Sequence, residues 1–98
     1  MTSYLSFESC AHLGQDEAYR RWYDDVHIPE VLKVPGFKRL LLRCRVVGDE
    51  PQPRYVSIFE VDGDPKAALG ALQAAVPAMQ MTDTLDREKT RIESLESV

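Results

Sequence analysis

The sequence predicts an α+β domain whose elements follow the order β-α-β-β-α-β. Two observations support this order: stretches that alternate apolar and polar residues flank two stretches with helical spacing, and Pro and Gly residues separate them. The split βαβ arrangement, with two helices on one face of a four-stranded antiparallel sheet, has this order. At 98 residues the chain has room for one core, so residues 1–98 are expected to form a single domain.

The first part of the chain predicts a strand and then a helix. Residues 4–10 alternate in the manner of a half-buried strand, with Leu5 and Phe7 on one face. Residues 16–28 carry an apolar arc at helical spacing. That arc consists of Ala18, Tyr19, Trp22, Tyr23 and Val26. Pro29 is expected to end or kink this helix, because it lacks an N–H group and disfavours helical geometry in the residue before it, and it can itself begin another turn through Val34.

Two further strands are expected to form a hairpin. Residues 37–47 and 55–61 are rich in residues that favour strands, and both alternate. Residues 48–53 between them contain one Gly, two Pro and two acidic residues, a composition typical of a loop.

The last part of the chain predicts a helix, a loop and a strand. Asp64 followed by Pro65 is typical of a helix start, and Pro77 is expected to end the helix. Residues 78–89 are expected to form a loop, and residues 90–98 a final strand.

The alternation predicts which residues face the helices. The helix side is expected to carry Leu5, Phe7, Leu40, Leu42, Val56 and Ile58, with Cys44 on the same side. The other, bare face is expected to carry Tyr4, Ser6, Glu8, Leu41, Arg43, Arg45, Tyr55, Ser57 and Phe59. Such a face is too aromatic and apolar to remain entirely exposed to solvent. We therefore expect a homodimer in which two sheets enclose a cavity for a small ligand.

Composition excludes several function classes. A formal net charge of −4 lacks the positive field that attracts nucleic acid. No stretch approaches the roughly 20 apolar residues of a membrane helix, and no secretion signal is visible, so a cytoplasmic protein without a membrane partner is expected. The two histidines and the distant Cys10 and Cys44 have no metal-ligand spacing, and no Gly-rich loop follows a strand. We therefore expect neither a metal nor another cofactor, with haem bound by His27 as a lone axial ligand as the alternative.

The stretch Trp22-Tyr23-Asp24-Asp25-Val26-His27-Ile28-Pro29, followed by Pro35-Gly36-Phe37, is the most distinctive part of the sequence. It resembles the first-helix signature of the dimeric α/β-barrel superfamily, particularly the EthD-like proteins. The resemblance covers residues 19–37 in motif and the whole chain in element order, and it implies a ferredoxin-like fold that dimerises. The superfamily contains cyclases, isomerases, cofactor-free monooxygenases, haem-using enzymes and proteins of unknown role, so the resemblance does not select a reaction.

His27 is the expected general base. It lies at the edge of the apolar arc, where it can face a cavity while Asp24 holds one ring nitrogen. A histidine with an ordinary pKa can take a proton from a carbon acid or a phenol and return it elsewhere. The resemblance implies the same role, because isomerases and cyclases of the superfamily are thought to use a histidine at the matching position. The alternative is a histidine that only packs the helix end.

The other candidate residues would bind substrate or stabilise charge. Tyr23 is expected to hydrogen-bond the substrate, and Arg43 to stabilise negative charge on an oxygen atom. Arg43 and Glu8 are expected to face one another across the bare sheet face, with a structural ion pair as the alternative. Further substrate contacts are expected from Tyr19, Trp22, Glu8, Tyr55, Ser57 and Phe59, although Tyr19 and Trp22 also suit the core.

The sequence therefore favours a cofactor-independent cyclase or isomerase that acts on a small, largely apolar oxygenated molecule such as an aromatic polyketide or a lactone. Two alternatives stay open. One is cofactor-free oxygenation of a phenol, and the other is a dimer that binds a small molecule without catalysis.

Overall fold

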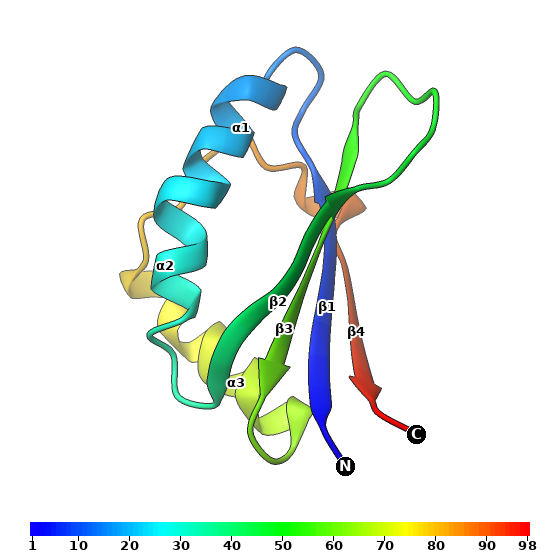
Figure 1. Ribbon diagram of the computed structural model, residues 1–98. Coiled ribbons are helices and arrows are strands. Elements are labelled where there is room, and N and C mark those ends of the chain that lie inside the picture. Colours follow the sequence, from blue (N-terminus) through cyan, green and yellow to red (C-terminus); the bar gives the residue numbers. More distant parts are fainter.

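The protein forms one four-stranded antiparallel sheet with its helices on one face (Figure 1). The computed structural model describes residues 1–98, and its strand order is β2-β3-β1-β4. The strands are β1 (Ser3–Cys10), β2 (Phe37–Arg45), β3 (Arg54–Val61) and β4 (Arg91–Glu96); the helices are α1 (Asp16–Trp22), α2 (Ile28–Val31) and α3 (Pro65–Ala75). The predicted ferredoxin-like α+β fold is thus confirmed. None of the helices has the length and apolar composition needed to cross a bilayer.

The helix predicted over residues 16–28 continues through Pro29 into the further turn that was expected there. Between α1 and α2 the residues Tyr23–His27 form a π-helical turn, and the N–H of Ile28 donates to the carbonyl of Tyr23, five residues earlier. Pro29 lies in the first turn of α2, where a missing N–H is tolerated. The chain therefore accommodates Pro29 by widening the turn that precedes it, and turns of this kind are frequent at functional sites.

The start of α3 and the turn before β2 follow local rules. The Asp64 side chain accepts a hydrogen bond from the backbone N–H of Lys66 at 2.9 Å, as an N-cap does, and Pro65 is the first residue of the helix. Gly36 has a φ of +96°, and a Cβ atom there would lie 3.2 Å from that of Ala68. Only glycine therefore fits this turn without strain.

The facing of β2 is changed by two bulges. The partners of Phe37, Arg39, Leu40 and Leu42 are Val61, Glu60, Phe59 and Ile58, so Lys38 and Leu41 are extra residues. The first bulge turns Leu40 toward the helices, and the second turns Arg43 and then Arg45 to that same side. Four residues of β2 face the helices: Phe37, Leu40, Arg43 and Arg45.

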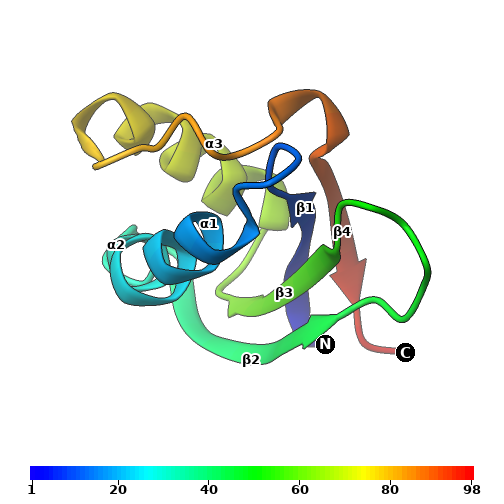
Figure 2. The same cartoon turned by 90° about the horizontal axis from the view of Figure 1, so that it is seen from above.

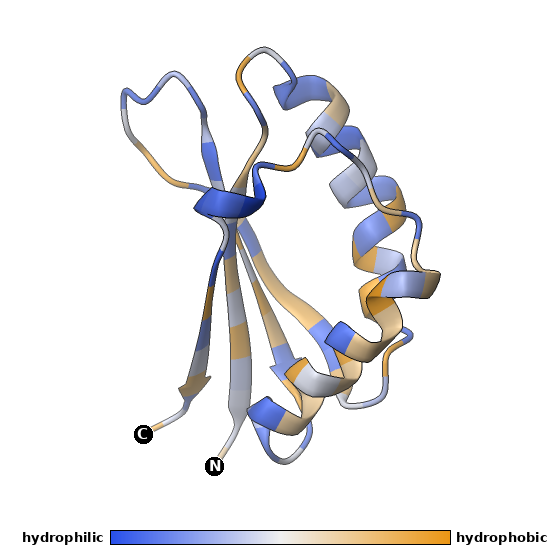
Figure 3. Cartoon of the chain, turned by 180° about the vertical axis from the view of Figure 1, so that it is seen from behind, coloured by the Kyte–Doolittle hydropathy of each residue, from blue (hydrophilic) through white to orange (hydrophobic).

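The predicted facing is right for β1 and wrong for most of β2 and β3. Leu5 is buried and Phe7 packs against the core, as predicted. On β3 the helix side carries Tyr55, Ser57, Phe59 and Val61, while Val56 and Ile58 lie on the open face; on β2, Leu42 and Cys44 are exposed on that face. Alternation misleads here because apolar residues lie on both faces of β3: Val56 and Ile58 on one, Phe59 and Val61 on the other. Figure 3 shows the hydropathy of each residue along these strands. The larger aromatic rings gain more by burial, and they take the inner side.

Two clusters fill the space between sheet and helices. The first, here called the apolar cluster, consists of Leu5, Val31, Val34, Phe37, Phe59, Val61, Ala68 and Leu72. The second, here called the aromatic cluster, consists of Ala11, Tyr19, Trp22, Tyr23 and Tyr55. The apolar cluster packs under α2 and α3, and the aromatic cluster packs under α1 and the π-helical turn.

The segment after α3 returns across the molecule to the end that holds α1 (Figure 2). It begins with a 3₁₀ turn at Val76–Ala78 and contains a second one at Arg87–Lys89. Pro77 lies in the first of these turns, just beyond α3, and most of residues 78–89 form the predicted loop. β4 then pairs with β1 at the edge of the sheet.

Candidate active site

Four aromatic rings form one wall of the candidate site. The ring centroid of Tyr19 lies 5.6 Å from that of Tyr23 and 5.8 Å from that of Tyr55. The Trp22 ring meets Tyr23 edge-on at 5.8 Å. These rings come from α1, the π-helical turn and β3, so the helix and the sheet build the wall together.

His27, the last residue of the π-helical turn, packs against this wall. Its ring stacks on Trp22 at a centroid distance of 4.6 Å and meets Tyr23 edge-on at 5.1 Å. The Nδ1 atom is buried and has no hydrogen-bond partner. Burial lowers the pKa of His27 to about 4; Glu30 acts in the opposite direction, and the charge of Arg43 adds to the lowering. The imidazole is therefore neutral near pH 7.

Asp24 does not hold a ring nitrogen of His27, as the sequence suggested. Its Oδ1 atom instead accepts a hydrogen bond from Nε of Arg43 at 3.2 Å. The π-helical turn changes the angle between these positions, so an argument from ordinary helical spacing fails here.

Arg43 is fixed by aromatic and polar contacts. Its guanidinium carbon lies 4.0 Å from the centroid of the Tyr23 ring and 5.1 Å from that of Tyr55. One of its terminal nitrogens donates to the Ser57 hydroxyl at 3.3 Å. Asp24 accepts a hydrogen bond from its Nε atom, so the planar group has little freedom left, although 18% of the side chain is exposed.

The cluster contains hydroxyl groups as well as rings. Tyr19 shares a short hydrogen bond with Ser9, a buried residue of β1. Burial raises the pKa of Tyr19 to about 12 and also raises that of Tyr23, so both phenols stay protonated and can donate hydrogen bonds. The hydroxyl of Tyr55 already donates to Oδ1 of Asp16 at 2.8 Å.

The structure brings most of the predicted site residues together. The residues gathered at the aromatic cluster are Tyr19, Trp22, Tyr23, His27, Arg43, Tyr55 and Ser57. They lie on the helix side of the sheet, which corrects the expectation that Arg43, Tyr55 and Ser57 occupy the bare face. The reversed facing of β3 and the bulges of β2 account for the difference.

Two predicted residues lie elsewhere. Glu8 is on the open face, where its carboxylate binds Arg54 at 3.2 Å, so it does not face Arg43. Phe59 belongs to the apolar cluster. Sequence reasoning also overlooked Ser9, whose place two residues after Phe7 on the helix side of β1 was the available signal.

A groove opens beside Arg43, between α1 and β2. It has a volume of about 220 Å³ and is lined by Arg20, Asp24, Arg43, Cys44, Arg45 and Tyr55. A larger and more open hollow of about 740 Å³ lies along residues 81–88, with His12 on its rim. His27 borders neither of them.

The segment that follows α3 covers the aromatic cluster. Nε1 of Trp22 donates to the carbonyl of Gln80 at 2.7 Å, and the N–H of Gln80 donates to Glu30 at 3.1 Å. Met81 and Leu85 pack against the rings. Residues 79–85 therefore separate the cluster from solvent on this side.

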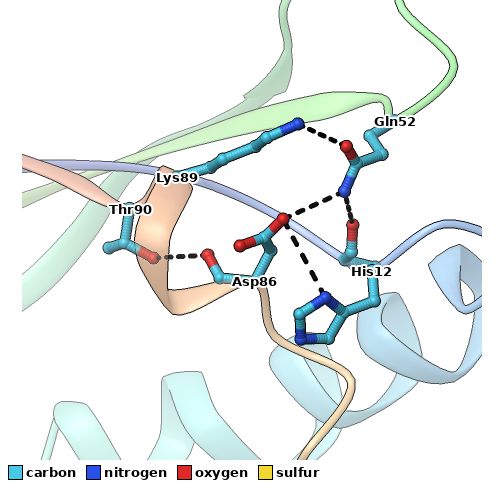
Figure 4. A network of polar contacts seen from close by, with 6 residues as sticks. His12, Gln52, Asp86, Lys89 and Thr90 are labelled. Carbon is cyan, nitrogen blue, oxygen red and sulfur yellow. Dashed lines mark hydrogen bonds and ion pairs between the residues drawn. The ribbon is translucent and has the colours of Figure 1, made fainter.

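A polar network anchors the far end of the covering segment (Figure 4). Gln52 donates from its Nε2 atom to the carbonyl of Ala11 at 2.8 Å and to Asp86 at 3.1 Å, and Lys89 donates to Gln52. Nδ1 of His12 lies 3.9 Å from the same carboxylate. These contacts tie the hairpin loop, the end of β1 and the second 3₁₀ turn together, so the network has a structural role. No group of three potential metal-ligating side chains is close enough to hold an ion.

Comparison with known proteins identifies the fold. No protein-family model and no curated protein sequence matches the chain. The structure is similar to the crystal structure of an EthD-family protein from Bacillus halodurans C-125, with a TM-score of 0.58 and 14% sequence identity over 100% of both chains. A likeness at this identity shows the fold alone, and it confirms the fold that the resemblance to EthD-like proteins implied.

Proposed function

We propose that the protein is a cofactor-independent isomerase or cyclase that works by proton transfer at His27. The observation that carries the proposal is the buried Nδ1 atom of this residue, which has no partner and lies in a polar cluster beside a fixed guanidinium. An unsatisfied buried polar atom costs about 1–3 kcal/mol. Such a group is understandable when a ligand supplies the missing partner.

The lowered pKa of His27 restricts the substrates that suit this base. With a pKa of about 4, the imidazole is unprotonated near pH 7 and ready to accept a proton. It is also a weak base, so it suits a proton that is already acidic, such as one on a carbon between two carbonyl groups or on a phenol. Polyketide-like and lactone substrates offer such protons.

Arg43 and Tyr23 complete the proposed chemistry. Removal of a proton from carbon places negative charge on a carbonyl oxygen, which a fixed guanidinium stabilises without rearrangement. The Tyr23 phenol, kept protonated by its raised pKa, can donate a hydrogen bond to a second oxygen. His27 then returns the proton to another atom, which gives an isomer, or to a departing hydroxide, which gives a cyclised product and water.

The covering segment supports a closed site that excludes water during the reaction. Residues 79–83 belong to no strand, and two hydrogen bonds of Gln80 attach them to Trp22 and Glu30, whereas Thr84 and Leu85 pair with the end of β1 and stay in place. Displacement of this segment would give a substrate access to His27 without disturbing the sheet.

The open face of the sheet supports the homodimer that forms part of this proposal. Leu42 and Leu95 are 48% and 38% exposed there. Half-buried apolar residues adjoin them: Tyr4, Val56 and Ile58. Charges of both signs lie on the same face, in Glu8, Arg54, Arg91 and Glu93. A second copy turned by a twofold axis matches such a mixed surface with itself. The proposed site lies within each chain, on the other side of the sheet.

A mass-spectrometric screen tests the proposal. Wild-type protein and two variants, His27→Gln and His12→Gln, are incubated with linear ketides, lactones, phenols and quinones, under air and under nitrogen. The wild-type product should have the substrate's mass, or be lighter by one water, in both atmospheres. His27→Gln should lower turnover about 10²–10⁴-fold because it removes the base. His12→Gln, in a side chain that is 53% exposed, is the matched control and should keep the wild-type rate.

Each contrary result replaces a specific part of the proposal. A gain of oxygen only under air would establish monooxygenation instead. Retention of a compound without any product would establish a binding protein. Turnover of His27→Gln at the wild-type rate removes His27 from the mechanism. Light scattering on the same samples should give twice the chain mass of 11.1 kDa, and a single chain mass in an active sample contradicts the dimer.

A further inference from the structure

We infer that the groove between α1 and β2 is a carboxylate-binding site, and that Arg20 and Arg45 together with Arg43 determine which molecules the protein accepts. As a statement about the substrate this rests on the proposed function, which it deepens by assigning the substrate a negative charge. As a statement about binding it rests on the charges and geometry of the groove itself.

The groove holds more positive than negative charge. Of the charged residues that line it, three are arginines and one is Asp24. Asp24 is bound by Arg43, while neither Arg20 nor Arg45 forms an ion pair. Elsewhere Arg21, Arg39 and Arg54 each contact a carboxylate, whereas Arg87 and Arg91 near the C-terminus are also without an ion pair. In a chain with a net charge of −4, two uncompensated arginines in one hollow favour an anion.

Tyr55 gathers two of these guanidinium groups at the groove. The guanidinium carbon of Arg20 lies 5.6 Å from the Tyr55 ring centroid, and that of Arg43 lies 5.1 Å from it. The carboxylate of Asp16 accepts a hydrogen bond from the Tyr55 hydroxyl, and Asp16 does not line the groove. Guanidinium groups that are held on aromatic rings keep their donors in place for a ligand.

A carboxylate is the anion that this arrangement suits. Guanidinium groups bind the two coplanar oxygens of a carboxylate with paired, charge-assisted hydrogen bonds. The volume of about 220 Å³ is below the roughly 300–1,000 Å³ typical of sites for larger ligands. The groove therefore takes a small acid, or the acidic end of a longer one.

Arg43 connects the groove with the surroundings of the proposed base. Arg43 lines it, and the same guanidinium lies over Tyr23, whose ring meets that of His27 at 5.1 Å. A molecule whose carboxylate is held by Arg20 and Arg45 would extend along Arg43 and Tyr23 toward the imidazole. The proposed substrates are then acids that also carry a carbonyl group or a lactone.

Titration of the ¹⁵N-labelled protein with benzoate tests this inference. Benzamide, a neutral compound of the same shape, and inorganic phosphate are titrated in parallel. Benzoate should bind saturably and shift the amide signals of residues 20–24, 43–45 and 55, whereas benzamide should bind at least about tenfold more weakly. Arg20→Gln and Arg45→Gln should each weaken benzoate binding about fivefold to tenfold, the size expected for loss of one hydrogen bond in a solvent-exposed groove.

Arg21→Gln is the matched control, because Arg21 neighbours Arg20 on α1 but pairs with Glu17 outside the groove. It should bind benzoate as the wild type does. Equal binding of benzoate and benzamide, or unchanged binding by both groove variants, would overturn the inference. Phosphate that binds as tightly as benzoate would show a general anion site and overturn the assignment to carboxylates.

The same titration separates this inference from the proposed reaction. His27 does not line the groove, so His27→Gln should bind benzoate normally even though it loses turnover. If no substrate is ever turned over, benzoate binding still decides the inference. If benzoate fails to bind, turnover of a neutral ketide still decides the proposed function.

Discussion

The two ends of the sheet's inner face are built from different chemistry. Under α2 and α3, the apolar cluster has no polar side chain among its members. Under α1, tyrosine hydroxyls, two serines, an arginine and a histidine share the interior with the rings. One sheet thus carries an ordinary core at one end and a polar interior at the other.

This difference indicates that the apolar end mainly stabilises the fold, while the polar end holds the candidate site. Apolar burial contributes roughly 25 cal/mol per Å² and needs no exact partners. A polar interior contributes little net stability, and each group without a partner is costly. The unpartnered nitrogen of His27 lies at the polar end, so we expect substitutions at the two ends to differ in what they change.

The largest expected effect is at the apolar end. Phe59→Ala removes a ring that packs edge-on against Phe7 and Phe37 at 5.8 and 5.6 Å, and it should lower the free energy of unfolding by about 3–5 kcal/mol. Urea denaturation measures this loss. Leu13→Ala, at a residue that is 70% exposed, should stay within about 0.5 kcal/mol of wild type. A loss below about 1 kcal/mol for Phe59→Ala would show that the apolar cluster does not dominate stability.

A smaller effect concerns pH and the polar end. The pKa of His27 is about 4 in the folded chain, below its ordinary value of 6.5. Between these two values the unfolded chain binds a proton that the folded chain does not, so stability is full above pH 6.5 and falls as the pH drops toward 4. His27 changes the free energy of unfolding by at most about 1.4 kcal/mol per pH unit in this range.

Urea denaturation of the wild type and of His27→Gln at several pH values between 4 and 7.5 checks this slope. As the pH falls through this window, protonation of His27 in the unfolded chain should lower the free energy of unfolding of the wild type. His27→Gln lacks this contribution, so the difference between the two proteins should change with pH. A constant difference across the window would contradict a neutral, buried imidazole.

The smallest expected effect is the loss of one buried hydrogen bond. Tyr19→Phe leaves the buried Ser9 hydroxyl without its partner and should cost about 1–2 kcal/mol. Adding Ser9→Ala should recover part of this loss, because the unsatisfied group is then absent. A double-mutant cycle by urea denaturation measures the coupling. Additive losses would show that the two hydroxyls do not interact.

Much of the fold could be predicted because it rests on local signals. Asp64 with Pro65 marks the start of α3, and the alternation of residues 4–10 predicts β1 with the correct facing. These signals act over a few residues and do not depend on the partner strand. Element order was therefore accessible from the sequence.

The site was only partly accessible, since it depends on relations between strands. Both faces of β3 carry apolar residues, so the sequence pattern does not specify which face is buried. The bulges at Lys38 and Leu41 appear only once β2 is paired with β3. The residue types at the site were identified from the sequence, but the face of the sheet on which Arg43 and Tyr55 lie was not.

The two bulges of β2 also bear on aggregation. β2 is an edge strand, and a regular edge of evenly spaced donors and acceptors invites pairing with a strand of another chain. Extra residues at Lys38 and Leu41 interrupt that spacing, and Arg39 and Arg45 add charge along the strand. The irregularity that turns Arg43 inward thus protects this edge from growing into a continuous sheet between molecules.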